Sequence, residues 1–322
     1  MKKSILALIA IWVLSGPSPS EAQKVYRIGA LVADGQFVPA FEGFKRKMVE
    51  IGYTEGKNIK YDLYNAEGNR DTLEKLAKKL VQDKPDLIVT SSTTATAPVA
   101  KASAGTNIPV VFLSAGNPLR FVKSYSSSGN NLTGISTSAI DITEKRIELL
   151  KELALGIKRV IALHNPKGEN YEANLKATRE AARKLGLELV EVNVQSGEEL
   201  IQRAKDLLNR KLGDGIFYPP DAVLNTAVKD ITPQVNRERL PSIAPNIGNV
   251  KDGALATYAA DYFALGQQGA VLVDKILRGA RPMDLPVEQP FKLKLVINMK
   301  TAKEMGLKIP KEILVRADEV IE

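Results

Sequence analysis

The run Thr90–Thr94 (Thr-Ser-Ser-Thr-Thr) is the strongest candidate for chemistry in this sequence. It follows the predicted strand 86–89 and opens an alanine-rich segment that we expect to be helical. Hydroxyl groups and the free amides at a helix N-terminus together suit a carboxylate. One of these hydroxyls would also cap the helix, and the two roles are compatible. Because capping requires only one of five hydroxyls, we expect this run to contact a ligand.

Other polar residues follow other predicted strands. Gly116, in Ser114–Pro118, allows close approach of the backbone to a ligand, although a plain turn explains it nearly as well. Asp221 either accepts a ligand ammonium group or caps the helix that follows it. Phe37 and Tyr258 either stack on an apolar or aromatic ligand or pack inside their own domain. The remaining candidates are Asp34, Gln36, Asn165 and Asn170.

These residues favour binding over catalysis. His164 is the only histidine and there is no cysteine, so a zinc site has too few of its usual ligands. No Gly-x-Ser-x-Gly nucleophile motif occurs. His164 ends a predicted strand, where a structural role is favoured over a catalytic one. We therefore expect no catalytic residue, no metal site and no cofactor.

The elements that position these loops alternate between strands and helices, a pattern typical of parallel α/β sheets. Strands are predicted at 25–33, 58–64, 86–89 and 108–113, and again at 159–164, 187–194 and 214–217. Asp71 with Glu74, and Ser196 with Glu199, have capping-box spacing. The two halves share an order of elements, which predicts two doubly wound, Rossmann-like α/β lobes.

Three segments are predicted to cross between the lobes. They are the Ser/Gly/Asn-rich stretch 124–131 with the following 132–137, the stretch 253–258, and the proline-rich stretch 283–290. A long helix is predicted from about Tyr262 to Leu277, ended by Gly279. Lobes joined in this way close around a ligand by hinge motion. The ligand is expected in the cleft, at the carboxyl ends of the strands.

The N-terminus has the pattern of a secretory signal peptide over residues 1–22. Lys2 and Lys3 precede an apolar run of about 10 residues, where a membrane span needs roughly 20. We expect a mature protein that begins near Gln23, outside the cytoplasm, soluble and without a lipid anchor. Its formal charge changes from +8 to +7 when two lysines and Glu21 are removed. Basic residues are interspersed with acidic ones and not with aromatics, so no nucleic-acid partner is expected.

Several segments resemble a family of ABC-transporter substrate-binding proteins that includes tryptophan- and tyrosine-binding members. The resemblance covers nearly the whole mature chain and rests on the segments 51–59, 86–89 with Thr93, 108–112, 129–134, 284–290, 296–302 and 314–322. Two departures stand out. Ser92-Thr93-Thr94 replaces a common Gly-Thr-Pro, and Gly116-Asn117-Pro118 replaces a common Gly-Asp-Pro. The second change removes a negative charge near the cleft and weakens the case for an aromatic amino acid ligand.

The resemblance implies a type I periplasmic-binding-protein fold, which we divide into lobe 1 (23–136 and 258–284) and lobe 2 (137–257 and 285–322). It implies capture of a small ligand, an amino acid or a related molecule, and delivery to a membrane permease by a monomer. The implied ligand-binding residues are Asp34, Gln36, Phe37, Ser92, Thr93, Ala115, Gly116, Asn117, Asn165, Asn170, Asp221, Gly253 and Tyr258. A ligand-sensing module for a membrane receptor is an alternative, and a secreted hydrolase is a weaker one.

Overall fold

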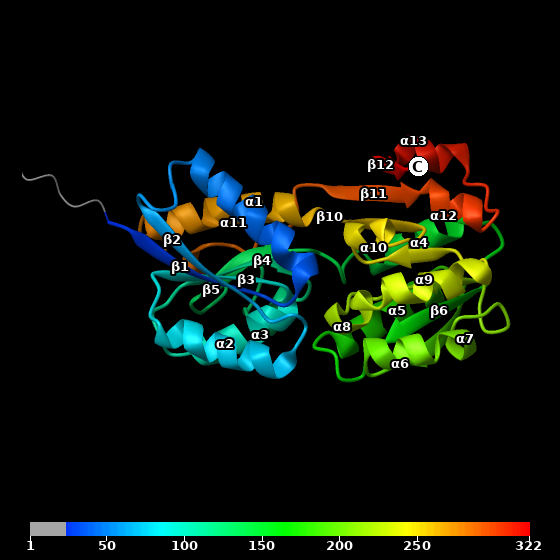
Figure 1. Cartoon of the computed structure of the whole chain (residues 1–322), viewed down its shortest axis with the longest axis horizontal. Helices are drawn as coiled ribbons and strands as arrows, with labels where there is room; N and C mark the ends of the chain where they lie inside the picture. The colour runs from blue at the N-terminus through cyan, green and yellow to red at the C-terminus, as the bar shows by residue number, and fades with distance from the viewer. Residues whose placement is uncertain (1–23) are drawn as a thin grey trace, which may run out of the picture.

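The computed structural model describes residues 24–322, and it consists of two α/β domains side by side, here called lobe 1 and lobe 2 (Figure 1). The predicted signal peptide, residues 1–22, lies outside the described residues. None of the helices from residue 24 onward combines the length and apolarity that a membrane-spanning segment needs.

Lobe 1 is built on a five-stranded parallel sheet whose central strands are buried on both faces. The order is β2 (Ile59–Asn65), β1 (Tyr26–Val32), β3 (Leu87–Ser91), β4 (Val110–Ala115) and β5 (Leu132–Ser136). All residues of β3 and β4 are buried, which explains their continuous apolar runs. This 2-1-3-4-5 order places a ligand-binding crevice between the carboxyl ends of β1 and β3.

Helices cover both faces of the first sheet. The helices α1 (Val38–Glu50) and α11 (Tyr262–Leu277) lie on one face, and α2 (Arg70–Gln82) and α3 (Thr93–Ser103) lie on the other (Figure 1). Glycines bring α1 and α11 into close contact: a Cβ on Gly266 would lie 1.8 Å from the Ala40 carbonyl oxygen, and one on Gly43 would lie 1.9 Å from that of Phe263. Short turns η1 (Gly35–Phe37), η2 (Pro118–Arg120) and η3 (Pro282–Asp284) complete the lobe.

Lobe 2 repeats the same strand order and extends it. Its sheet runs β12 (Glu319–Ile321), β11 (Leu293–Asn298), β10 (Ala256–Ala260), β9 (Ser242–Ala244), β8 (Gly215–Phe217), β6 (Arg159–His164) and β7 (Glu188–Asn193). Strands β7, β6, β8, β9 and β10 correspond to β2, β1, β3, β4 and β5. Within the part of the chain that the structure describes, only β10 and β11 of this sheet pair antiparallel. The predicted similarity of the two halves is therefore confirmed.

Two core clusters lie on the two faces of this second sheet. One contains side chains of α4 (Thr143–Leu153), α5 (Tyr171–Lys184) and α13 (Lys311–Arg316). The other contains side chains of α6 (Gly197–Gln202), α7 (Ala204–Leu207), α8 (Ala222–Thr226) and α9 (Val228–Arg237). The short helices α10 (Ile247–Lys251) and α12 (Met299–Glu304) follow β9 and β11.

Three connections join the lobes, as predicted, and the first begins at the predicted boundary 136/137, although not within the predicted stretch 124–131. The stretch 124–131 is a loop of lobe 1 and residues 132–136 form β5, so the first connection comes after Ser136. The stretch 253–258 leads into β10, which pairs in the second sheet as far as Ala260, so the boundary predicted at 257/258 falls within this strand. The third connection spans 285–292, where Glu288 still pairs with Ile135 beside β5.

The two predicted capping boxes have different outcomes. Ser196 caps α6 by accepting the amide of Glu199 at 3.1 Å, as predicted. The cap of α2 is Asn69, which accepts the amide of Thr72 at 2.9 Å, while Asp71 lies in the first turn of the helix. The sequence rule fails here because an asparagine two residues earlier occupies the capping position.

Candidate ligand-binding site

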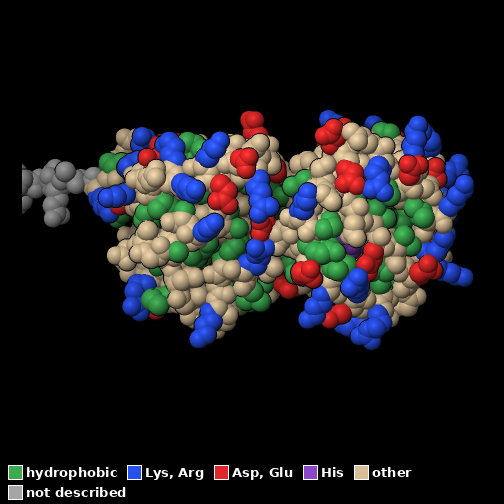
Figure 2. All heavy atoms as spheres, turned by 90° about the horizontal axis from the view of Figure 1, so that it is seen from below, with side chains coloured by type: hydrophobic (Ala, Val, Ile, Leu, Met, Phe, Trp, Pro, Cys, Tyr) green, Lys and Arg blue, Asp and Glu red, His purple; other side chains and the backbone are tan. Residues whose placement is uncertain are grey.

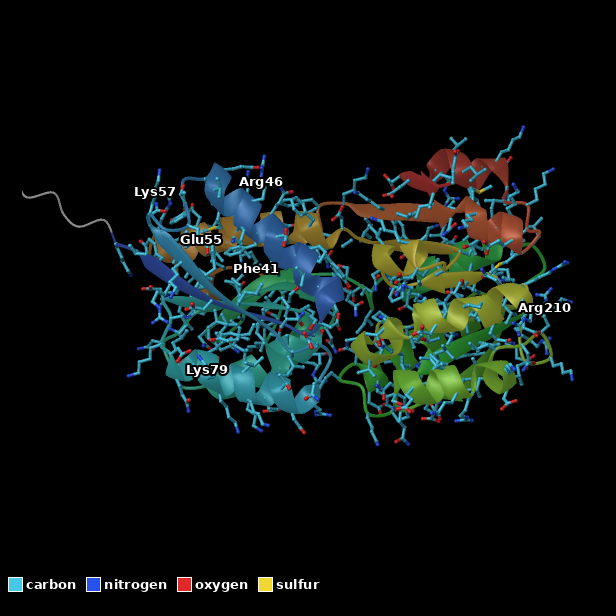
Figure 3. All side chains as sticks on the ribbon, in the orientation of Figure 1. Phe41, Arg46, Glu55, Lys57, Lys79 and Arg210 are labelled. Carbon is cyan, nitrogen blue, oxygen red and sulfur yellow. The ribbon has the colours of Figure 1, made fainter. Side chains whose placement is uncertain are left out.

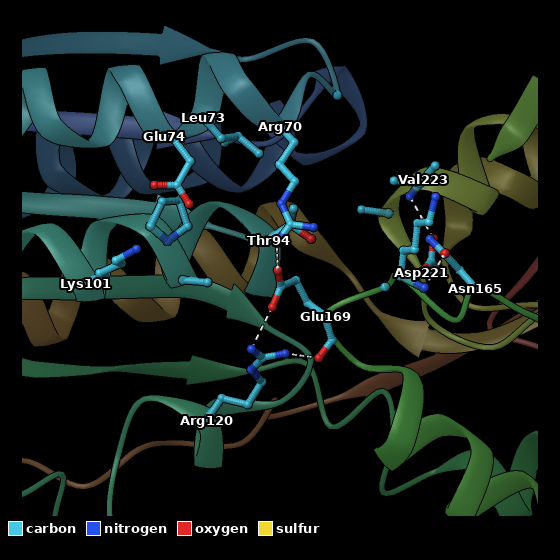
Figure 4. Close-up of a pocket in the computed structure, with 16 residues that line it drawn as sticks. Arg70, Leu73, Glu74, Thr94, Lys101, Arg120, Asn165, Glu169, Asp221 and Val223 are labelled. Atoms are coloured by element: carbon cyan, nitrogen blue, oxygen red, sulfur yellow. Dashed lines mark hydrogen bonds and ion pairs between the residues drawn. The ribbon is translucent and has the colours of Figure 1, made fainter. Parts of the chain in front are cut away.

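Three adjoining cavities lie between the lobes and are lined from both sides. The inner cavity, of about 40 Å³, is lined by Phe37, Ser92, Thr93, Thr94, Ser114, Gly116, Thr137, Ala139, Asn170, Pro220, Asp221, Ala222, Asn225, Pro245 and Tyr262. The outer cavity, of about 280 Å³, shares Thr94, Asp221 and Ala222 with it and opens between Arg70, Arg120 and Glu169 (Figure 4). A third, acidic cavity of about 350 Å³ contains Asp34, Glu67 and Asp252.

The N-terminus of α3 points into the inner cavity from lobe 1. Ser92 caps this helix by accepting the amide of Ala95 at 3.0 Å, and it does so with a φ of 91°, in the left-handed region that favours glycine. The amides of Thr93 and Thr94 precede the first intrahelical hydrogen bonds, so they remain available to a ligand. This end of α3 can therefore bind an anionic group.

The Thr93 hydroxyl holds the neighbouring loop in place. Its Oγ1 accepts hydrogen bonds from the amides of Gly116 (2.9 Å) and Asn117 (3.2 Å). Gly116 lines the inner cavity, whereas Asn117 contributes its backbone to this contact and lines none of the three cavities of the cleft. Thr93 thus joins the loops that follow β3 and β4 and shapes one wall of the cavity.

From lobe 2, Asp221 is the acidic residue that lines both the inner and the outer cavity. Its Oδ1 caps α8 by accepting the amides of Val223 (2.9 Å) and Leu224 (2.8 Å), and Asn165 Nδ2 lies 3.5 Å away. Burial raises the pKa of the Asp221 carboxyl, and these hydrogen bonds partly offset the effect. Both roles considered from the sequence are therefore compatible: Oδ1 caps the helix, and Oδ2 makes no hydrogen bond within residues 24–322 and is free for a cation.

Asp34 and Gln36 lie at the acidic cavity. Asp34 accepts the amide (2.9 Å) and the Nε2 group (3.1 Å) of Gln36, while burial raises the pKa of its carboxyl. Gln36 Oε1 in turn accepts Asn246 Nδ2 of lobe 2 at 3.1 Å. This contact closes the cleft on its acidic side.

On the opposite side, Glu169 of lobe 2 binds two arginines of lobe 1. Its carboxylate lies 2.6 Å from Arg120 Nη2 and 3.2 Å from Arg70 Nη2, and its carbonyl oxygen accepts Arg120 Nη1 (Figure 4). Figure 2 shows basic and acidic side chains meeting where the lobes join. Together with the Gln36–Asn246 contact, these ion pairs hold the lobes in a closed arrangement.

The structure brings most of the predicted residues to the cleft but not all of them. Ala115 is buried behind the cavity wall, where its carbonyl oxygen accepts the Thr137 amide at 2.9 Å. Gly253 lies in the turn after α10, and its carbonyl oxygen accepts the Thr301 hydroxyl at 3.0 Å. Tyr258 packs on the lobe 2 core and lines none of the three cavities.

Tyr262, which is absent from the residues expected on sequence grounds, is the aromatic residue of this connection that reaches the inner cavity. Its ring lies 5.2 Å from that of Phe37, measured between centroids. It follows the carboxyl end of β10, where the rule for α/β sheets places ligands. The sequence places the lobe boundary before Tyr258, and this error moves the expected aromatic contact four residues too early.

His164 does not take part in the cleft. Its ring is 1% exposed, and neither ring nitrogen has a hydrogen-bond partner within residues 24–322. Burial lowers the pKa of His164 to about 4. It lies at the carboxyl end of β6, with its ring against that of Tyr171 at 6.3 Å, so the structural role favoured from the sequence agrees with its position.

Comparison with known proteins places these observations in a family. Residues 28–321 match the family described as ABC transporter substrate binding protein. A tyrosine-binding protein of Clostridioides difficile is 30% identical in an alignment of 292 residues that covers 89% of this chain and 82% of the relative.

Two solved structures bear on the conformation. A Streptococcus pneumonia ABC domain in complex with L-Trp is 27% identical, with a TM-score of 0.85 over 92% of this chain and 100% of that chain. The ligand-free, open structure of a substrate-binding protein with adhesive properties from Clostridium difficile is 25% identical and covers 92% of this chain and 99% of that chain, but its TM-score is 0.69. Identity is similar in the two comparisons, but the overall likeness to the ligand-free, open structure is lower.

The predicted type I periplasmic-binding-protein fold and the predicted role are confirmed by these matches. Members of such a family bind a solute and present it to a permease, and they catalyse no reaction of their own, which confirms the expectation of a non-enzymatic protein. This chain belongs to the ABC transporter substrate-binding proteins.

Proposed function

We propose that this protein captures an L-amino acid in the cleft, with an aromatic amino acid as the first candidate. The observation that carries the proposal is the inner cavity, which lobe 1 lines with the N-terminus of α3 and lobe 2 lines with Asp221. One side can bind a carboxylate and the other an ammonium group. Similarity to a tyrosine-binding protein and to a domain in complex with L-Trp supports this choice.

In the proposed complex, the ligand α-carboxylate accepts hydrogen bonds from the Thr93 and Thr94 amides. The α-ammonium group binds Asp221 Oδ2, and the side chain lies beside Phe37 and Tyr262. These walls must move apart to admit it, because the inner cavity measures only about 40 Å³ in this closed structure. Aromatic pairs of this kind favour an aromatic side chain. The acid missing at Asn117 does not count against such a ligand, because Asn117 lines none of the three cavities of the cleft.

The proposed binding residues are those predicted residues that line the inner or the acidic cavity, with Asn165 of the outer cavity and Tyr262 added. We further propose that the mature protein acts outside the cytoplasm as a monomer, released from its signal peptide, and that it delivers its ligand to a membrane permease. The lobe division predicted from the sequence remains part of this proposal, with the second connection moved to follow Ala260.

The test is isothermal titration calorimetry on protein that has been unfolded, dialysed and refolded to remove any co-purified ligand. L-tyrosine, L-tryptophan, L-leucine and L-glutamate are titrated into the wild type and into Asp221→Asn. We expect binding of an aromatic amino acid, weakened at least about tenfold in Asp221→Asn because a charge-assisted contact is lost. Asp71→Asn, an exposed acid in the first turn of α2, is the control. Absence of binding to all four amino acids, or equal affinity in the wild type and Asp221→Asn, would contradict the proposal.

A further inference from the structure

A buried positive charge lies directly behind the inner cavity. The Arg146 side chain, on α4, is 1% exposed and forms no ion pair within residues 24–322. Its Nε, Nη1 and Nη2 donate to the carbonyl oxygens of Tyr258 (2.8 Å), Ala139 (2.9 Å) and Pro245 (2.9 Å). Carbonyl dipoles satisfy the hydrogen-bonding groups, but they leave the charge without a counter-ion.

Arg146 remains charged in this position. Burial lowers the pKa of the guanidinium to about 10, which is still well above neutral pH. A buried charge without a partner is costly, and proteins normally pair it or replace it with an apolar residue. Its presence is therefore understandable if an anion approaches it during function.

The position of the charge indicates where that anion would lie. Ala139 and Pro245, whose carbonyl groups bind Arg146, both line the inner cavity. Tyr262 lines the same cavity from lobe 1, and the charge of Arg146 is close enough to influence its hydroxyl. The guanidinium therefore lies behind the lobe 2 wall of the cavity that the N-terminus of α3 enters from lobe 1.

The acidic residue that lines the inner cavity does not neutralise Arg146. Asp221 lines the inner cavity, but it lies beyond ion-pair distance of Arg146, and its Oδ1 is occupied by the two amides at the start of α8. Burial raises the pKa of Asp221, whereas a close guanidinium would lower it.

We propose that Arg146 is a specificity-determining residue that selects ligands with a carboxylate through its electric field and without touching them. The proposal rests on the function proposed above and adds a second requirement to it. A carboxylate in the inner cavity is attracted by α3 from one lobe and by Arg146 from the other, and both attractions are complete only when the lobes are closed. Selection of the anion and closure are thereby coupled.

The experiment compares L-tyrosine with L-tyrosinamide, which has the same side chain and ammonium group but no carboxylate. Calorimetry gives the ratio of the two affinities for the wild type, Arg146→Met and Arg146→Lys. Thermal unfolding verifies that each variant is folded. We expect the wild type to prefer tyrosine at least about a hundredfold, and Arg146→Met to lose about tenfold of that preference, mostly through weaker tyrosine binding.

Arg146→Lys distinguishes the effect of the positive charge from that of the three hydrogen bonds to carbonyl groups. Lysine keeps the positive charge but cannot make all three hydrogen bonds to the carbonyl groups. We therefore expect a lower free energy of unfolding, and a preference for tyrosine over tyrosinamide that stays within about threefold of the wild-type value. A folded Arg146→Met with the wild-type preference would overturn the inference. Equal loss of both ligands in Arg146→Lys and Arg146→Met would also overturn it, because it would show a purely structural role.

A second neutral variant covers the case in which Arg146→Met does not fold. Arg146→Gln keeps amide donors for the surrounding carbonyl groups but carries no charge, so we expect it to lose about tenfold of the preference for tyrosine over tyrosinamide. A folded Arg146→Gln with the wild-type preference would overturn the inference. If the wild type binds neither compound nor any carboxylate of the amino acid panel, the proposed function and the inference both fail. If tyrosine binds but the preference is insensitive to Arg146→Met, the inference alone fails.

Discussion

Arg120 Nη2 and Glu169 Oε2 lie 2.6 Å apart although the two residues belong to different lobes. Arg70 binds the same carboxylate at 3.2 Å, so one acid links the start of α2, the η2 turn and the segment before α5. These contacts can exist only when the cleft is closed.

Glu169→Gln is therefore expected to weaken ligand binding by shifting the lobes toward an open arrangement. Partly exposed ion pairs contribute up to about 1 kcal/mol, so a two- to fivefold loss of affinity is expected. The wild-type affinity should also fall as salt is raised, and that of Glu169→Gln should fall less. Small-angle scattering should show a more extended ligand-free variant. Glu172→Gln, an exposed acid on α5, serves as the control, and an equal response of both variants would show that Glu169 does not hold the lobes closed.

Thr93→Val should damage the site through the backbone of the neighbouring loop. The substitution leaves the Gly116 and Asn117 amides without their acceptor, at a cost of about 1–3 kcal/mol in the free energy of unfolding. We expect at least about tenfold weaker binding as the cavity wall loses its geometry. Thr93→Ser keeps the hydroxyl oxygen, so its stability and its ligand affinity should both lie close to those of the wild type. Urea denaturation and calorimetry measure the two effects, and equal behaviour of the valine and serine variants would refute the role of the hydroxyl.

Ser92 combines a favourable cap with an unfavourable backbone conformation, and two substitutions separate these contributions. Ser92→Ala loses the capping hydrogen bond to Ala95 and keeps the strained φ, so we expect destabilisation of about 1–2 kcal/mol. Ser92→Gly loses the same cap but relieves the strain, so its free energy of unfolding should lie within about 1 kcal/mol of the wild type. Chemical denaturation provides both values. A glycine variant less stable than the alanine variant would show that the backbone at Ser92 stores no strain.

Gly266→Ala should destabilise the contact of α1 with α11. The new methyl group would meet the Ala40 carbonyl oxygen at 1.8 Å, which forces the two backbones apart. We expect a loss of about 2–4 kcal/mol in the free energy of unfolding. Gly35→Ala is the matched control, because nothing lies within 4 Å of its Cβ position, and it should change the stability little. Similar melting temperatures for both variants would show that the helices can separate without cost.

His164 should make stability depend on pH in the weakly acidic range. The pKa of this buried histidine is lowered to about 4, while an unfolded chain has an ordinary value near 6.5. Between these values the unfolded state binds a proton that the folded state does not, so stability is full above pH 6.5 and falls as the pH decreases toward 4. From pH 7 to pH 5 the loss due to His164 is about 2 kcal/mol.

His164→Leu should remove this contribution without removing a hydrogen bond, since neither ring nitrogen has a partner within residues 24–322. Urea denaturation at pH 7 and pH 5 should show a smaller change for the variant than for the wild type. Identical changes would indicate that His164 is protonated in the folded protein.

The fold is predictable from the sequence because its signals are local. Buried strands such as β3 read as continuous apolar runs, and α11 is predicted with the limits that the structure has. The connections are harder, because β10 is a short strand whose partner β11 follows only after the whole of α11. Because the sequence places the lobe boundary at 257/258, inside β10, it predicts Tyr258 as the aromatic contact to the ligand, whereas Tyr262 lines the inner cavity.

Residues of the site can be predicted from the sequence only where they lie at the carboxyl ends of parallel strands, where ligands bind in α/β sheets. Ser92 and Thr93 lie at the end of β3 and are found from their hydroxyl groups. Arg120 and Glu169 cannot be paired from the sequence, because their contact depends on the angle between the lobes. Arg146 resembles any helical arginine until its burial is known. The chain departs from its family at Ser92, where a φ of 91° explains why glycine is common at that position.

The side-by-side contact of α1 and α11 also sets the order in which the protein can be completed. A chain synthesised from its N-terminus presents α1 early, but Tyr262–Leu277 emerges only after β6 to β10 have been made. Until then the first sheet lacks one of its covering helices, and its apolar side chains remain open to other partners. Lobe 1 therefore cannot be completed before β6 to β10 of lobe 2 have been made, and the nascent chain stays incompletely folded until most of its length is available. If the protein is exported as proposed above, such a delay keeps the chain unfolded until it has crossed the membrane.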